Sequence, residues 1–250
     1  MGKQPLWMIS VGHLAGLAGI VLGLWLVASG AVSAWWLLAW PPLHVVGSLV
    51  LSVGLHRYFS HGSFKTTRFW HNFMAFYSTL LLNGSPHGWA AAHNAHHVYS
   101  DTNKDPHIAN WTYLVWKRYR KSPIPRRGLR GLVGDPVCAF VHRTGLWLWL
   151  VFTAAMLLVS PKLYLFAYLM PLGSVHLIGA LHQVASHNSR GPRDIWWLEL
   201  ILPACGEWLH KTHHEHPRWS DFKTEHHHLD LGSRFIELIR TDAGHGKAAA

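Results

Sequence analysis

Four long apolar segments constrain the fold of this chain more than any other feature of its 250 residues. They cover about residues 6–29, 35–55, 145–160 and 163–181, and none of them contains Asp, Glu, Lys or Arg. Apolar stretches of about 18 residues or more are typical of membrane-spanning helices. The sequence therefore predicts an all-α integral membrane protein with four transmembrane helices.

Two apolar stretches need separate interpretation. The N-terminal one can be mistaken for a signal peptide, but its apolar part is too long and no small-x-small cleavage site follows it. We expect it to be retained as the first span. Residues 69–83 are apolar but too short to cross a bilayer, which predicts a buried or interfacial helix lying against the membrane face.

The distribution of charge predicts the topology. The chain has a formal net charge of +10, and nearly all its Lys and Arg lie in residues 56–143 or after residue 181. The turns between spans on the other side are short and nearly uncharged. By the positive-inside rule, both termini and a helical cap of about residues 56–143 and 182–240 face the cytoplasm. We expect residues 1–250 to form a single domain.

A basic run within the cap has several candidate partners. An acidic electron carrier, a CoA or phospholipid head group, and the anionic membrane surface all fit it. Nucleic acid is excluded because the basic residues lie between apolar spans rather than on a soluble domain. The run consists of Lys117, Arg118, Arg120, Lys121, Arg126, Arg127 and Arg130.

Histidine is concentrated in three boxes beside the apolar segments. They are HRYFSH at 56–61, HNAHH at 93–97 and HKTHH at 210–214, here called the first, second and third boxes. In the second and third boxes the spacing i, i+3, i+4 places three imidazoles on one helix face, so two such faces can hold two metals. His56 and His61 are five residues apart and share a face only if the helix unwinds between them.

Other histidines are less strongly patterned. Gln183 and His187 are four residues apart at the end of the fourth span, so His187 can add a ligand and Gln183 a bound water or its own oxygen. Of the three histidines at 226–228, at most one is expected to reach a metal. Those expected to be structural or interfacial are His71, His87, His107, His142, His176 and His182.

The donor chemistry limits the choice of metal. Cys138 and Cys205 have no CxxC spacing, so any metal site must rest on histidine. All-imidazole sites suit zinc, iron or copper. Eight or nine histidines are too many for one zinc ion, which takes about four ligands. Two metals with open positions are the natural count, and iron is the metal that uses open positions for oxygen.

The order of these boxes around four spans resembles the membrane fatty-acid desaturases, closest to the acyl-CoA Δ9 or stearoyl desaturase type. The flanks HRYFSHGSFK, HHVYSDTNKDPH and GEWLHKTHHEHP, and the segment HHLDLGSRFIELI, are also similar to that family, and the match covers roughly residues 35–240. The resemblance implies four spans and a cytosolic cap holding two iron ions (Fe²⁺/Fe³⁺). By this resemblance the ligands are His56, His61, His93, His96, His97, His187, His210, His213 and His214. Gln183 stands where the family often has an asparagine that holds water near one iron.

The resemblance also implies an activity. It implies an O2-dependent desaturase that introduces a cis double bond into a fatty acyl chain. Because no cytochrome b5 domain is fused to the chain, we expect a separate electron donor of ferredoxin, rubredoxin or cytochrome b5 type. Ala91, Ala92 and Asn94 stand where acyl-CoA enzymes tend to carry charged residues. Acyl-CoA is therefore only slightly preferred over an acyl-lipid or an acyl-carrier-protein thioester.

Supporting residues are predicted on general grounds. Acidic groups commonly orient metal-bound histidines, and the candidates are Glu207, Asp101 and Asp105, although the DP sequence at Asp105 is also a frequent turn starter. An unactivated methylene must be positioned by a bent apolar tunnel. The candidates for its closed end are Trp40, Pro41 and His44, for which ordinary packing within the span is an equally good interpretation.

Two alternative functions use the same residues differently. A di-iron hydroxylase or ketolase acting on a lipid or carotenoid would leave oxygen in its product, but the flanks DPH and GEWLHKTHHEHP favour desaturation. A metal transporter is a remote alternative. It would place its ligands near the middle of several spans, whereas these boxes lie outside the spans.

Overall fold

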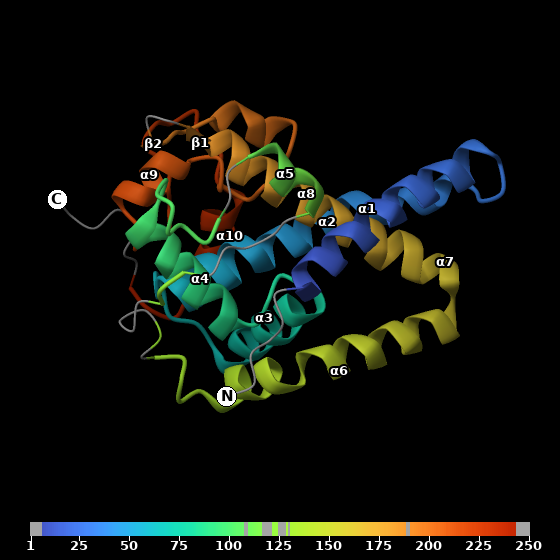
Figure 1. Cartoon of the computed structure of the whole chain (residues 1–250), viewed down its shortest axis with the longest axis horizontal. Coiled ribbons are helices and arrows are strands. Elements are labelled where there is room, and N and C mark those ends of the chain that lie inside the picture. The colour runs from blue at the N-terminus through green and yellow to red at the C-terminus, as the bar shows by residue number, and fades with distance from the viewer. Residues whose placement is uncertain are drawn as a thin grey trace.

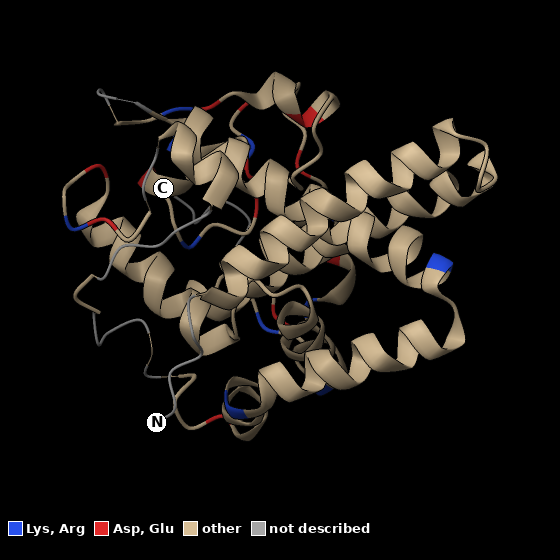
Figure 2. Ribbon diagram, turned by 45° about the vertical axis from the view of Figure 1, so that its right-hand side comes forward, with Lys and Arg blue, Asp and Glu red and all other residues tan. Residues whose placement is uncertain are grey.

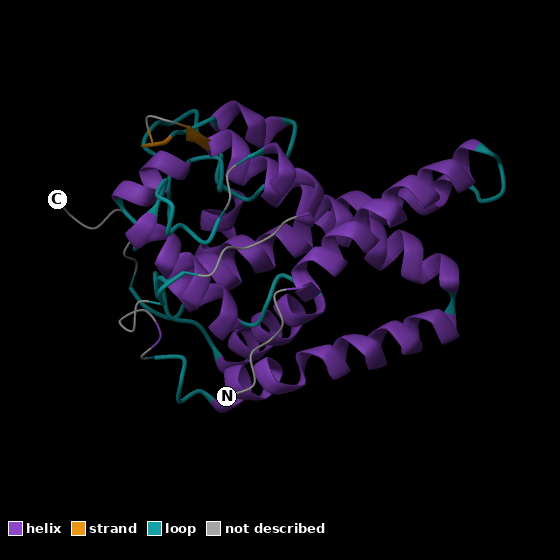
Figure 3. Ribbon diagram, viewed as in Figure 1, coloured by secondary structure: helices purple, strands orange, loops and turns teal. Residues whose placement is uncertain are grey.

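The computed structural model describes residues 7–107, 110–116, 122–124, 129, 131–188 and 191–243. Helices dominate the described chain, and the described strands form one short antiparallel pair, β1 (His187–Asn188) and β2 (Gly191–Pro192) (Figure 3). The basic run predicted to bind a partner lies outside the described residues.

Within the described residues, four helical stretches are long and apolar enough to cross a membrane, which confirms the predicted fold class. Two of them also contain segments of different winding. The stretches are α1 (Trp7–Ala28); η1 (Ala34–Ala39) with α2 (Trp40–Leu49) and η2 (Val50–Ser60); α6 (Pro136–Val159); and α7 (Pro161–Tyr164) with η4 (Leu165–Leu169) and α8 (Met170–Ser186).

These helices give the molecule two unlike ends. The turns from α1 to η1 and from α6 to α7 lie at one end, on the right of Figure 1, and the histidine-bearing cap lies at the other. Among the described residues the turn end carries one charged side chain, Lys162, whereas charges are frequent in the cap (Figure 2). The charge asymmetry found in the sequence is therefore an asymmetry between the two ends of the fold.

Three helices run further into the cap than the apolar segments predict. The second stretch continues from Leu55 to Ser60, the fourth from Leu181 to Ser186, and α6 begins at Pro136 rather than at 145. The side chain of Asp135 accepts hydrogen bonds from two backbone N–H groups of the first turn of α6, an N-cap that starts the helix in polar sequence. Apolar content alone predicts where lipid surrounds a helix and not where the helix ends.

The cap consists of shorter helices. Its α4 (Pro86–Tyr99) begins with the same combination of a capping side chain and a proline, since Ser85 Oγ accepts from Gly88 N at 3.2 Å. Its α3 (Arg68–Leu80) is the predicted short apolar helix and packs against η2 and α6. The other helices of the cap are α5 (Trp111–Trp116), η5 (Trp196–Leu200), α9 (His210–Glu215) and α10 (Leu231–Ile239).

The first box lies on a π-helix, η2, with His61 directly after its last residue. A π-helix closes its hydrogen bonds between residues five apart and occurs mostly at functional sites. Residues i and i+5 therefore come close to the same face, and the rings of His56 and His61 lie 5.2 Å apart. A π-helix is under-wound relative to an α-helix, so the local unwinding that a shared face requires is present over this segment.

Glycine allows α1 and α8 to pack closely. A Cβ on Gly16 would lie 2.4 Å from the Cα atom of Gly173, so the two backbones are in direct contact. Gly12, Gly19 and Gly23 face α8 or its neighbours in the same way. This contact fixes α8, which ends next to His187.

Candidate metal centre

The nine histidines that the sequence singled out come together in two groups. We call them the five-histidine group (His56, His61, His93, His97 and His213) and the four-histidine group (His96, His187, His210 and His214). Within each group the potential ligand atoms all lie within 4.8 Å of one another. The groups adjoin, since the ring centroids of His97 and His214 are 4.5 Å apart.

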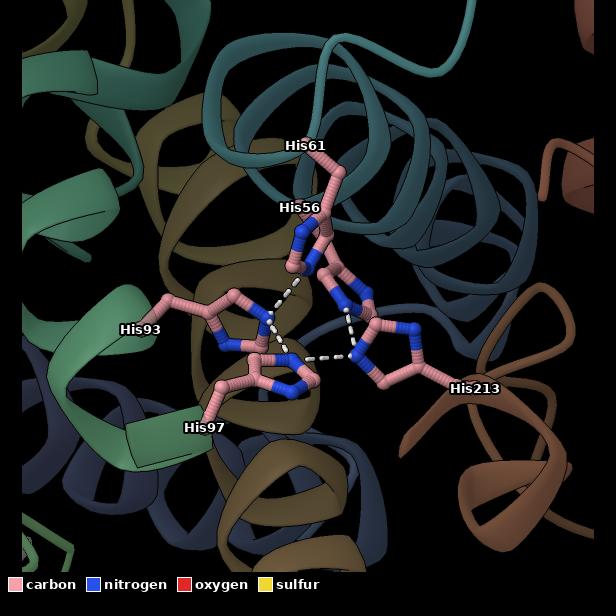
Figure 4. A group of neighbouring side chains, drawn as sticks. All are labelled: His56, His61, His93, His97 and His213. Atoms are coloured by element: carbon pink, nitrogen blue, oxygen red, sulfur yellow. Dashed lines mark hydrogen bonds between the residues drawn. The ribbon is translucent and has the colours of Figure 1, made fainter. Parts of the chain in front are cut away.

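The rings of the five-histidine group point toward one another from three parts of the chain (Figure 4). His61 Nε2 lies 2.7 Å from His93 Nε2, and His93 Nε2 lies 3.0 Å from His97 Nε2. His213 Nε2 lies 2.8 Å from both His97 Nε2 and His56 Nε2. Helices η2, α4 and α9 thus each direct at least one Nε2 atom to a common point.

The four-histidine group is built in the same way from α4, α9 and the end of α8. Its Nε2 to Nε2 distances are 3.2 Å from His96 to His214, 3.1 Å from His214 to His210 and 2.7 Å from His210 to His187. His187, predicted from its spacing to Gln183, therefore lies with the boxes.

Each of the HxxHH boxes contributes to both groups. Within a box, the two residues four apart stay together, as His93 and His97 do, while the third, His96 in that box, joins the other group. At about 100° per residue, the i+4 side chain is offset by about 40° from the first and the i+3 side chain by about 60° the other way. The expectation that each box forms one metal-binding face is therefore corrected: each box joins the two groups.

The three predicted acidic residues contact histidine rings on the atom facing away from the groups. Glu207 Oε2 lies 2.6 Å from His56 Nδ1, Asp101 Oδ1 lies 3.0 Å from His187 Nδ1, and Asp105 Oδ2 lies 2.9 Å from His96 Nδ1. Each Nδ1–H donates to its carboxylate, so each Nε2 carries a lone pair directed into its group. Asp105 also accepts from the backbone N–H of His107, a turn contact of the kind that its DP sequence suggests.

Electrostatics oppose protonation of buried rings in both groups. Burial, and then the neighbouring imidazoles, lower the pKa values of His93, His210 and His213 well below the ordinary value. Burial opposes ionisation of Glu207, but its contacts with His56 and Arg57 outweigh burial and lower its pKa to about 2. Unprotonated rings at His93, His210 and His213, with an ionised Glu207 nearby, suit a cation.

The spacing of the Nε2 atoms also fits metal ions. With metal to nitrogen bonds of about 2.1 Å, two ligands at right angles lie about 3.0 Å apart, and the observed distances run from 2.7 to 3.2 Å. Lone pairs at this separation repel unless a cation lies between them. The histidine groups can therefore hold metal ions, one in each group.

A cavity of about 70 Å³ adjoins both groups. Its apolar wall includes Leu51, Val175 and Ile178 from the second and fourth spans. Gln183 also lines it, and its buried side-chain nitrogen has no hydrogen-bond partner in the described part of the chain. The amide is therefore placed for a ligand or water in this cavity.

The predicted tunnel residues lie elsewhere. Trp40 Nε1 donates to Ser174 Oγ, and His44 contacts Ser174 Oγ at 2.9 Å and Pro203 O at 2.9 Å. Pro41 lies in the first turn of α2. None of the three is among the described residues that line the cavity beside the histidines.

Several residues at the site were not singled out by the sequence. His107 and His182, expected to be structural, line the cavity. The ring centroid of His107 is 4.7 Å from that of His96, and the ring centroid of His182 is 4.5 Å from that of His210. Arg57 is fully buried beside His56. A charged residue at the end of an apolar span is the signal that indicates it.

Two other clusters are separate from the histidine groups. His227 packs on Trp196 at 4.7 Å, and residues 226–228 belong to neither group. His71, Asp135 and Cys138 also lie together. Their arrangement is explained by the cap of α6, because Asp135 is bonded to two backbone N–H groups and to Arg68.

No family model matches the chain, but it is similar to curated proteins over most of its length. It is 25% identical over 212 residues to sn-1 stearoyl-lipid 9-desaturase of Anabaena variabilis, covering 78% of this chain and 77% of that protein. It is 27% identical over 227 residues to Delta-9 acyl-lipid desaturase 1 of Arabidopsis thaliana, covering 80% and 73%. It is 26% identical over 246 residues to Delta(9)-fatty-acid desaturase fat-5 of Caenorhabditis elegans, covering 88% and 70%.

Proposed function

The chain belongs to the membrane fatty-acid desaturases, and on this basis we propose that it uses two iron ions and O2 to introduce a cis double bond into a fatty acyl chain. It is an oxidoreductase. The observation that carries the proposal is the convergence of nine histidine side chains in two adjoining groups beside an apolar-walled cavity. Membership of the family makes iron the preferred metal over zinc or copper.

Two irons held by the nine histidines would supply the oxidising chemistry: O2, two electrons and two protons would be consumed together with two hydrogen atoms of adjacent methylenes, giving a double bond and two waters. The side chains of the protein bind and orient. Glu207, Asp101 and Asp105 hold their histidines with Nε2 unprotonated, and the apolar wall of the cavity receives methylenes and excludes water.

For the acyl head group we propose a glycerolipid. The side-chain amide of Asn94 donates a hydrogen bond to the carbonyl of Ala90, and the side chains of Ala91 and Ala92 carry no charge that could bind a CoA phosphate. Two of the relatives are named for lipid-linked acyl chains. This proposal replaces the slight preference for acyl-CoA drawn from the sequence, and acyl-CoA and acyl-carrier-protein become outcomes of the test.

We propose that electrons come from a separate carrier of ferredoxin, rubredoxin or cytochrome b5 type. A second, open cavity of about 690 Å³ is lined by His61 and His97 and includes Arg218 and Asn94. The cavity with the apolar wall is lined by other histidines of the groups. A carrier at the open cavity can therefore approach the five-histidine group without competing with the acyl chain.

The proposed orientation places both termini in the cytoplasm. The first described residues of α1 and the last helix, α10, lie toward the cap and away from the turn end (Figure 1). Because the cap carries most of the Lys and Arg of the chain, the positive-inside rule assigns it to the cytoplasm.

The test is gas chromatography with mass spectrometry of lipids from a host that expresses the protein together with an electron donor. We expect new cis-monoenes with the wild type and none with His97→Ala. His216→Ala is the control, because His216 is exposed and stacks on Trp219 outside both groups. Oxygenated lipids would favour the hydroxylase or ketolase, and metal uptake without a change in lipids would favour the transporter.

The head group is tested with purified protein. Vesicles of phosphatidylcholine carrying labelled stearoyl chains are compared with stearoyl-CoA and stearoyl-acyl-carrier protein. We expect label in monoenes from the vesicles. Faster conversion of stearoyl-CoA would contradict the glycerolipid proposal and leave the desaturase intact.

A further inference from the structure

A buried arginine stands next to the first histidine of the first box. Arg57 is 0% exposed, and its guanidinium reaches three parts of the chain. Nη1 donates to Ser220 O at 3.0 Å and to Asp230 Oδ1 at 3.1 Å, and Nη2 donates to Cys205 O at 3.1 Å. A fully buried cation is costly unless it is paired and bonded, so these contacts form a specific site rather than a surface pair.

Asp230 completes the pair. It is 4% exposed, and besides Arg57 it accepts from Ser233 N at 2.9 Å, as the N-cap of α10, and from Phe222 N at 3.1 Å. The ion pair therefore connects η2 with the segment from Phe222 to α10. That segment supplies none of the nine histidines.

Two glycines leave room for the pair. A Cβ on Gly206 would meet Asp230 Oδ1 and Arg57 Nη2, the latter at 2.7 Å, and a Cβ on Gly232 would lie 2.9 Å from Arg57 Nη1. Gly206 also has φ +92, a conformation that L side chains rarely adopt. The backbone on both sides is shaped to the ion pair.

The ion pair is connected to residues that hold the five-histidine group in place. Cys205, whose carbonyl binds Arg57, lies two residues before Glu207, the partner of His56. Ser52 Oγ lies 3.0 Å from Cys205 O and 2.5 Å from Glu207 Oε1, linking the same two points.

Phe222 forms a second connection. Its ring centroid is 3.9 Å from Arg57 Cζ. The same ring is 5.0 Å from the ring of His213 and 6.0 Å from that of His56. Both histidines belong to the five-histidine group.

We propose that Arg57 and Asp230 are positioning residues for the five-histidine group, so that breaking their ion pair weakens metal binding there and not at the four-histidine group. The inference rests on the proposed metal centre. Selectivity follows from the contacts: His187 and His96 are held by Asp101 and Asp105. Among the described residues no recorded contact joins Arg57 or Asp230 to a ring of the four-histidine group.

The experiment measures Fe²⁺ binding by the full-length chain in nanodiscs. Only the monodisperse fraction is counted, and oxygen is excluded. We expect two Fe²⁺ per wild-type chain, and at least tenfold weaker binding at one of the two sites in Asp230→Asn and Arg57→Lys, the range seen when an outer partner of a ligand is removed.

Paired backgrounds identify which site is affected. In His187→Ala, which disables the four-histidine group, adding Asp230→Asn is expected to weaken the remaining site by the same factor. In His61→Ala, which disables the five-histidine group, adding Asp230→Asn is expected to leave the Fe²⁺ affinity of the remaining site unchanged. Equal effects in both backgrounds would overturn the proposal.

Asp135→Asn is the matched control. Asp135 also caps a helix and pairs with an arginine, Arg68, but neither residue contacts the two groups in the described structure. We expect it to bind two Fe²⁺ with wild-type affinity.

If Asp230→Asn yields no folded chain, Phe222→Leu decides, because it keeps apolar volume and removes only the ring between Arg57 and His213. Two Fe²⁺ bound with wild-type affinity by folded Asp230→Asn, or by Phe222→Leu where that variant decides, would overturn the proposal. A wild-type chain that binds no Fe²⁺ would instead overturn the metal centre itself.

Discussion

At the scale of single residues, the carboxylates behind the histidines decide which nitrogen faces the site. Glu207 is the clearest case, because it is 7% exposed and holds His56 Nδ1 at 2.6 Å. An imidazole whose Nδ1–H is bonded to a carboxylate is a stronger and better oriented ligand through Nε2. The carboxylates are therefore as necessary to the proposed centre as the ligands.

Replacing Glu207 by glutamine should weaken Fe²⁺ binding about 10- to 100-fold, because the neutral amide no longer polarises His56. Isothermal titration of the purified chain with Fe²⁺ measures this. Glu215→Gln, at the end of α9 but exposed and, among the described residues, paired with Lys211, should bind as the wild type does. Equal affinity of Glu207→Gln and wild type would show that the charge of Glu207 is not needed.

A separate prediction concerns Gln183. Gln183 lines the cavity beside the groups, and its side-chain nitrogen has no hydrogen-bond partner among the described residues. Gln183→Leu should therefore lower kcat by about tenfold while both irons stay bound, and Gln183→Asn should restore most of the activity. Steady-state rates with metal analysis on the same samples test this. Loss of iron in Gln183→Leu would make Gln183 a structural support or a ligand instead.

Sequence reasoning reached the histidines but not all of their surroundings. Boxes are visible because ligand spacing is periodic within a helix. Arg57 and Asp230 are 173 residues apart and meet only in the folded chain. His182 was likewise missed because its neighbour, His210, lies on a different helix.

At the scale of elements, irregular helices and close helix contacts place the ligands. The π-helix η2 brings His56 and His61 toward one group, which is the local unwinding that their spacing of five residues requires. The extended end of α8 carries the chain to His187. Apolar periodicity predicts the existence of these helices, and their winding and length follow from caps and tertiary packing.

The contact of α1 with α8 can be tested directly. Gly16→Leu should force apart two backbones in contact, at a cost of about 1–3 kcal/mol or more, and lower the melting temperature in nanodiscs. Ala18→Leu, at an exposed position of the same helix, should leave the melting temperature unchanged. An unchanged melting temperature for Gly16→Leu would contradict the close packing.

The short helix η5 contains a buried carboxyl, Glu199, whose effect on stability depends on pH. Burial raises the pKa of Glu199 from 4.5 to about 7, although Ala204 N donates to Oε1 at 3.1 Å. Between these values the folded chain holds a proton that the unfolded chain has lost, so the free energy of unfolding falls as pH rises, by about 1.4 kcal/mol per pH unit.

Glu199→Gln removes this dependence, because glutamine mimics the protonated acid. The variant should match the wild type near pH 4.5 and be more stable above pH 7. Urea unfolding in detergent at several pH values measures the difference. A difference that does not vary with pH would mean that Glu199 is ionised in the folded chain.

At the scale of the whole molecule, the fold separates a turn end that is nearly free of charge from a cap that holds the site. The cavity with the apolar wall and the open cavity with Arg218 are lined by different histidines of the two groups. The proposed acyl chain and electron carrier therefore have separate routes to one centre. Hydropathy predicted the two ends of the molecule, whereas the cavities depend on side chains from spans and cap together.

The central claim is that nine histidines hold two irons that carry out desaturation. The most direct measurement is iron per chain, by mass spectrometry of the metal content, in the same preparation whose acyl desaturation is assayed. The account predicts about two irons per chain, and loss of both activity and about one iron on His213→Ala. Full desaturase activity in a preparation without iron would contradict it.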